Sequence, residues 1–166
     1  MQIERFVTAK HVKGLRDSAN LGATITFILE VDAIAHENST WQIEEIFNVL
    51  STYSEHPTYI NIAGGLLNYE IGISQLASSF SNSVDIFTLA VSNTSCAYAI
   101  NEIFLSDFLK FVDSNPNILD FGIDWVYNSF FLISENKIAC FHSSPPALSH
   151  GSFTGKSESW NPRNRS

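Results

Sequence analysis

The alternation of apolar and polar residues predicts short strands along much of the chain. Residues 23–32 are rich in β-branched and aromatic side chains, which is typical of a strand. Residues 3–8, 58–63 and 66–73 favour strands for the same reason. Residues 84–91 have few polar interruptions, so we expect them to form a strand in the centre of a sheet.

One segment between these strands has helical spacing instead. Its apolar residues recur every three or four positions: Ile43, Ile46, Phe47, Leu50 and Tyr53. Glu44 and Glu45 fall on the opposite face of this helix, where we expect them to be solvated. Ser39 followed by Gln42 fits a capping box at its start, and Pro57 ends it.

The second half of the chain predicts another helix and a hairpin. Ser106 is typical of a helix N-cap, and the helix extends through Asp113. Residues 123–134 and 137–143 both resemble strands, and the intervening Glu135-Asn136 suits a two-residue hairpin turn. About seven strands and two or three helices in mixed order predict an α+β domain, with a largely antiparallel sheet and the helices packed on it.

The length of 166 residues predicts one domain. We expect a single α+β domain over residues 1–146 and a polar C-terminal tail over residues 147–166, because Ser, Gly, Asn and Pro dominate after Pro145-Pro146.

The N-terminal residues and the cysteines indicate the compartment. No apolar run follows a basic start, so we expect no secretory signal, and no window of 18 apolar residues predicts a membrane span. Cys96 and Cys140 are too few for a disulfide-stapled domain, although one disulfide between them stays an alternative to two buried thiols. We therefore expect a cytoplasmic protein with no membrane partner.

The charge distribution points to the kind of partner. Seventeen acids and nine bases give a net charge of −8, which argues against non-specific binding to nucleic acid. Residues 17–109 contain eleven acids and no Lys or Arg. Such a single-sign field attracts a basic partner, although a protein with few charges can also lack bases by chance. We expect an acidic surface from residues that flank or interrupt strands: Glu30, Asp32, Glu37, Glu70 and Asp85.

The chain lacks recognisable catalytic or cofactor motifs. Gly64-Gly65 is read as a turn, because neither a phosphate loop nor a dinucleotide fingerprint surrounds it. Cys140 and His142 have the spacing of one strand face, but no second ligand pair is nearby. Asp120 and Asp124 are expected to be solvated rather than a catalytic pair. The sequence therefore predicts no enzyme, no cofactor and no metal ion.

Two ways of holding a partner are compatible with the pattern. An added strand could pair with an unprotected sheet edge, for which we nominate residues 66–73, with Tyr69 and Glu70, and the late hairpin, with Trp125 and Tyr127. Tail residues 147–166 could cover such an edge instead, and the partner would then dock on side chains alone. Trp125 and Tyr127 are nominated as binding anchors, although most aromatic residues of this stretch belong to the core.

In size, acidity, mixed α+β pattern and Lys-poor Asn/Ser-rich segments such as 77–83 and 92–95, the chain resembles the immunity proteins of bacterial toxin systems, such as those of contact-dependent growth inhibition. The resemblance implies a cognate toxin domain, often a nuclease, that is bound and kept inactive in the producing cell. Two other readings remain open. One is a small enzyme or ligand-binding domain with a dispersed site, and the other is an adaptor subunit of a larger complex.

Overall fold

A computed structural model describes residues 2–37, 39–63, 76–80, 84–88, 91–92, 94–134 and 137–151. In chain order the elements are α1 (Gln2–Asn20), β1 (Ile25–Leu29), β2 (Ala33–Ala35), α2 (Ser39–Thr52), β3 (Thr58–Asn61), β4 (Leu76–Phe80), β5 (Val84–Thr88), β6 (Ala97–Asn101), α3 (Glu102–Ser114), the 3-10 helix η1 (Pro116–Asp120), α4 (Ile123–Ile133), β7 (Ala139–Ser144) and β8 (Leu148–His150). The predicted α+β class is confirmed.

The strands form a six-stranded sheet in the order β1-β6-β3-β7-β5-β4, and β2 pairs with β8 in a separate two-stranded sheet. Within the large sheet only β3 and β7 are parallel; the other described pairs are antiparallel. The expectation of a largely antiparallel sheet is therefore confirmed. Residues 84–88 form β5, which lies next to the edge strand β4 rather than in the centre.

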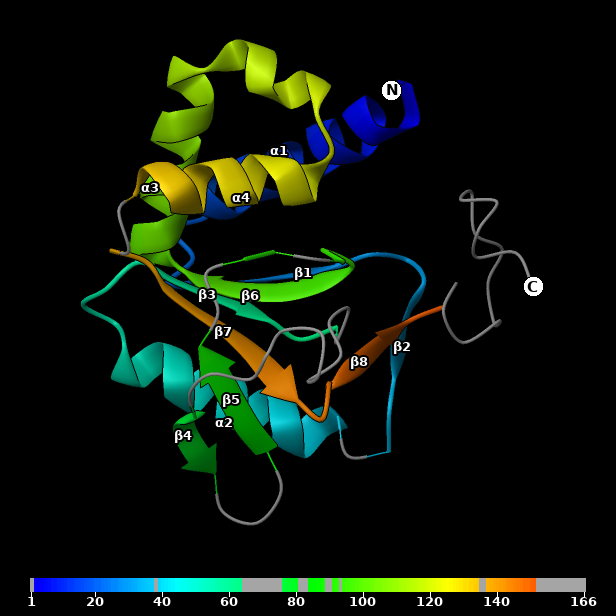
Figure 1. Cartoon of the computed structure of the whole chain (residues 1–166), viewed down its shortest axis with the longest axis vertical. Helices are drawn as coiled ribbons and strands as arrows, with labels where there is room; N and C mark the ends of the chain where they lie inside the picture. The colour runs from blue at the N-terminus through cyan, green and yellow to red at the C-terminus, as the bar shows by residue number, and fades with distance from the viewer. Residues whose placement is uncertain are drawn as a thin grey trace.

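Helices cover both faces of the large sheet, with α1, α3 and α4 on one face and α2 on the other (Figure 1). Alternate strand residues face the two layers, so Tyr59 packs with the three-helix layer and its neighbour Ile60 packs with α2. The first core contains a cluster of aromatic rings around Tyr59, Phe104 and Tyr127. Complete burial of one such side chain contributes about 1.5–3 kcal/mol.

The N-terminal segment is a helix, and the strand predicted over residues 3–8 is wrong. The inward positions of α1 are Thr8, His11, Val12 and Leu15, which recur at helical spacing and are buried. Two of these four residues are polar, so the apolar pattern alone did not reveal the helix. Gly14 lies inside α1, and a Cβ at this position would lie 3.6 Å from Cδ1 of Ile28.

Residues 123–134 are likewise helical, which makes the predicted late hairpin wrong. The buried residues of α4 recur at three- and four-residue intervals: Ile123, Val126, Tyr127, Phe130 and Phe131. Only the second predicted arm is a strand, β7, and it pairs in parallel with β3. The preceding helix, α3, begins at Glu102 rather than near Ser106, because the Asn101 side chain accepts a hydrogen bond from the backbone N–H of Phe104.

Other predicted elements are present with shifted details. Strands occur within residues 23–32 and 58–63, and α2 ends at Thr52, before Pro57. The capping box is not formed. Ser39 Oγ instead donates to the carbonyl of Ala147 over 2.7 Å, and Gln42 Nε2 donates to the carbonyl of Pro145 over 3.3 Å. These bonds tie α2 to the segment before β8.

The start of the expected tail packs with the domain. Ala147 and Leu148 are buried against the α2 side of the sheet, and β8 pairs with β2. Residues 152–166 lie outside the described residues, as do residues 66–73 and the Gly64-Gly65 turn.

Both cysteines are buried free thiols in different cores, Cys140 on the three-helix side and Cys96 on the α2 side. Burial raises the pKa of each thiol from 9.0 to about 12. Folding therefore favours the protonated thiols.

We expect the free energy of unfolding to fall as the pH rises from about 9 towards 12, because the unfolded chain ionises its thiols first. Urea titrations across this pH range measure the slope. Both thiols should resist a thiol reagent at neutral pH and react fully in denaturant. Rapid modification of either native thiol would contradict this burial.

Candidate functional site at the acidic end of the sheet

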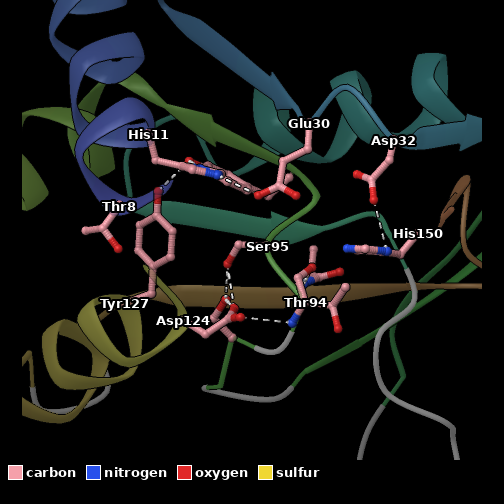
Figure 2. A network of polar contacts seen from close by, with 12 residues as sticks. Thr8, His11, Glu30, Asp32, Thr94, Ser95, Asp124, Tyr127 and His150 are labelled. Atoms are coloured by element: carbon pink, nitrogen blue, oxygen red, sulfur yellow. Dashed lines mark hydrogen bonds and ion pairs between the residues drawn. The ribbon is translucent and has the colours of Figure 1, made fainter. Parts of the chain in front are cut away.

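Several polar segments meet at one end of the large sheet. Strands β1, β3 and β7 run in the same direction, so their last residues share this end with the first residues of β6. The segment after β1 brings Glu30 and Asp32 here, and the segment before β6 brings Ser92, Thr94 and Ser95. The start of α4 adds Asp124 from the three-helix layer (Figure 2).

Three carboxylates are held at this end by different partners. His11 Nε2 lies 2.9 Å from Glu30 Oε1, and His150 Nδ1 lies 3.3 Å from Asp32 Oδ2. Asp124 accepts hydrogen bonds from the hydroxyls of Ser92 and Ser95 and from the backbone N–H of Thr94, as Figure 2 shows in part.

The charges of the three carboxylates all affect the pKa of the buried Cys96 thiol. Burial is the main cause of its raised pKa, and Glu30, Asp32 and Asp124 raise it further because their negative charges oppose a thiolate. The carboxylates come from two different layers of the fold and lie at the same end of the sheet (Figure 2). We call Glu30, Asp32 and Asp124 the acidic cluster.

Four acids elsewhere in the described structure form ion pairs with Lys or Arg. In the three-helix layer the pairs are Arg5–Asp120, Lys13–Asp17, Arg16–Asp113 and Lys110–Asp107. Glu30 and Asp124 differ from these acids, because their partners among the described residues are a histidine, hydroxyls and a backbone N–H. The basic residues near the N-terminus thus compensate acids of the helices.

A buried hydrogen-bond chain positions Glu30. The hydroxyl of Tyr127 donates to that of Tyr98 over 2.7 Å, and the Tyr98 hydroxyl lies 3.0 Å from His11 Nδ1. The Tyr98 hydroxyl accepts from Tyr127, so its own single proton is donated to Nδ1 of His11. The proton of a neutral His11 then sits on Nε2, which donates it to Glu30. Burial raises the pKa of both tyrosines, which keeps them protonated as donors.

Asp124 also stabilises an unusual backbone conformation. Thr94 has a φ of 64°, in the left-handed region that β-branched residues rarely occupy. Its N–H donates to Asp124, and its carbonyl accepts from Asn61 Nδ2 over 3.4 Å. Asn128 binds both backbone groups of Ser92. The turn before β6 is therefore fixed on both sides.

Exposed apolar residues are chain neighbours of two carboxylates of the acidic cluster. Leu29 and Val31 neighbour Glu30 along the chain, and both are exposed. Trp125, next to Asp124, is 71% exposed, and Asp124 is the only charged residue of α4. Carboxylates next to exposed apolar residues in the chain are suited to bind another protein.

The structure places the acids that were nominated for the partner-binding surface in different locations. Glu30 and Asp32 lie together, whereas Glu37 is exposed between β2 and α2. Asp85 lies in β5 at the same end of the sheet, four strands from β1, which corresponds to about 19 Å.

The two aromatic residues nominated as binding anchors differ in exposure. Trp125 is exposed, but Tyr127 is fully buried, so its nomination as a surface anchor is wrong. Alternation placed both residues on one strand face, whereas in a helix they lie on opposite sides. Tyr69 and Glu70 lie outside the described residues.

No protein-family model matches the chain, and no curated protein matches its sequence significantly. Among the described residues, no helix is long and apolar enough to cross a membrane. Function must therefore be inferred from the site itself.

Proposed function

We propose that the acidic cluster binds a basic partner protein and that the chain neutralises this partner, as the resemblance to toxin-immunity proteins implies. The observation that carries the proposal is that Glu30, Asp32 and Asp124 lie at the same end of the sheet, the first two within one compact group and the third bonded to the turn before β6 (Figure 2). A concentrated negative field accelerates encounter with a positively charged surface, such as the nucleic-acid-binding face of a nuclease.

The exposed apolar residues beside the cluster supply the affinity that exposed charges alone do not. Exposed ion pairs contribute only about 0–1 kcal/mol each. Tryptophan is enriched among the residues that dominate binding energies, so Trp125 is the anchor that we assign to this surface. Charge then governs the rate of association, and burial of Trp125 governs the rate of dissociation.

The edge of β1 offers a second contact for the same partner. Glu30 N donates to Cys96 O, and Glu102 N donates to Thr24 O. In this antiparallel pair, the even-numbered residues of this segment are therefore the ones whose backbone groups bond to β6. The backbone groups of Ile25, Phe27 and Leu29 therefore point away from β6, and no described strand pairs with them. The late hairpin is not formed and residues 66–73 lie outside the described residues, so our proposal places strand addition at the β1 edge instead. An added strand would place Lys or Arg beside Glu30.

The proposal is tested by affinity capture from the source cells at low ionic strength in EDTA. We expect a stoichiometric partner with an isoelectric point above about 9, which is toxic when expressed alone and harmless when co-expressed with the chain. Glu30→Gln/Asp32→Asn should lose it, whereas Glu44→Gln/Glu45→Gln removes two charges from α2 and should retain it. An acidic partner, or equal retention by both variants, contradicts the proposal.

A further inference from the structure

A histidine joins two carboxylates of the acidic cluster in a compact group. One ligand atom each from Glu30, Asp32 and His150 can be chosen so that all lie within 4.8 Å of one another. We propose that these three residues bind a divalent transition-metal ion, with Zn²⁺ as the best fit. This inference concerns the chain alone and does not depend on the proposed function.

The spacing of the donor atoms suits a tetrahedral ion. Zn²⁺ binds imidazole nitrogen and carboxylate oxygen at about 2.0–2.2 Å, which places two ligand atoms about 3.3–3.6 Å apart. His150 Nδ1 and Asp32 Oδ2 are 3.3 Å apart (Figure 2). Glu30 has three rotatable side-chain bonds, so a small rotation brings its oxygen within the same radius.

Backbone hydrogen bonds fix the three ligands relative to one another. Gly151 N donates to Asp32 O over 2.8 Å, and His150 stands opposite Ala33 in the β2–β8 pair. Ala33 N donates to Glu30 O over 3.0 Å, and Glu30 N donates to Cys96 O over 2.7 Å. The ligands therefore reach the ion without a large loss of backbone freedom.

His11 would hold a metal ligand, Glu30, without contacting the ion itself. Its Nε2–H donates to one oxygen of Glu30, which orients the carboxylate and leaves the other oxygen for an ion. The buried hydroxyl of Tyr98 fixes the His11 ring in turn. Such outer-shell contacts typically contribute 10–100-fold to metal affinity.

The donor set selects among cations. Carboxylates alone suit Mg²⁺ and Ca²⁺, whereas an imidazole favours transition metals. Three protein ligands leave a coordination position for water, and the side chains of Glu30, Asp32 and His150 are each between 21% and 28% exposed, so an ion can enter. A bound ion would offset the charge of two of the three clustered carboxylates and would compete with a basic partner.

The test is calorimetric titration of the metal-free full chain with ZnCl₂, without any partner. We expect one Zn²⁺ per chain, Mn²⁺ to bind more weakly, and Mg²⁺ and Ca²⁺ to bind at least about tenfold more weakly than Zn²⁺. His150→Ala and Asp32→Asn should each weaken Zn²⁺ binding by at least about tenfold, and His11→Gln by about 10–100-fold. His56→Ala, an exposed histidine outside the group, should bind as the unmodified chain does.

Circular dichroism spectra verify that each variant is folded. Absence of zinc binding, or unchanged binding by folded His150→Ala, would overturn the proposal. Equal affinity for Mg²⁺ and Zn²⁺ would overturn the assignment to a transition metal. Because partner capture is done in EDTA and the titration without a partner, either proposal can fail while the other stands.

Discussion

Phe104→Ala should lower the free energy of unfolding by about 3–5 kcal/mol, the usual cost of removing a buried aromatic ring. Phe104 is fully buried on α3 and packs against rings from three elements of its core. Its ring centroid lies 5.7 Å from that of Tyr59, 5.9 Å from that of Phe108 and 5.4 Å from that of Phe130. The surrounding rings belong to β3, α3 and α4, so they cannot all move into the cavity.

Urea unfolding of the variant and the unmodified chain measures this loss. Phe121→Ala is the matched control, because the same side chain is removed from an exposed position between η1 and α4. We expect the control to change stability by about 0.5 kcal/mol or less. Similar losses for the two variants would show that the aromatic cluster does not organise the core.

Asp124→Ala should lower the free energy of unfolding by about 3 kcal/mol. Each hydrogen bond to a charged group contributes about 1.5–3 kcal/mol, and water replaces the lost carboxylate at only some of its donors. The variant leaves the hydroxyls of Ser92 and Ser95 and the N–H of Thr94 without this acceptor. The left-handed conformation of Thr94 then loses one of its two supports.

Asp120→Ala is the control for Asp124→Ala. Asp120 is an exposed acid that pairs with Arg5, so its loss should cost about 0–1 kcal/mol. Asp124→Asn should fall between the two, because it keeps one acceptor oxygen but loses the charge. Equal stability of the Asp120→Ala and Asp124→Ala variants would mean that Asp124 does not hold the turn before β6.

Elements with a clear apolar period were predictable from the sequence. The α2 helix has apolar residues on one face, and β3 is a run of buried residues that ends before a glycine pair. The pattern misled at α1, where Thr8 and His11 face the core, and at α4, whose high content of aromatic and branched residues is equally typical of strands. In both segments tertiary packing decided the structure.

The acidic cluster was only partly predictable. Glu30 and Asp32 were nominated because they lie at the end of a predicted strand, which can be read from neighbouring residues alone. His11 and His150 are far from them along the chain, and His150 lies within the expected tail, so local spacing indicated no metal ligands. Asp124 was expected to be solvated, but it accepts hydrogen bonds from the turn before β6. The signal that could have found it is that it is the only charged residue of α4.

The claim that charge at the acidic cluster recruits a basic partner is tested most directly by the association rate of the captured partner, measured by stopped flow in EDTA as the salt concentration rises. Attraction between exposed charges is screened over about 8 Å at physiological ionic strength. We predict that the rate for the unmodified chain falls steeply with salt, and that Glu30→Gln/Asp32→Asn starts lower and falls less. A rate that stays flat with salt, or falls equally for both proteins, would contradict a role for this cluster.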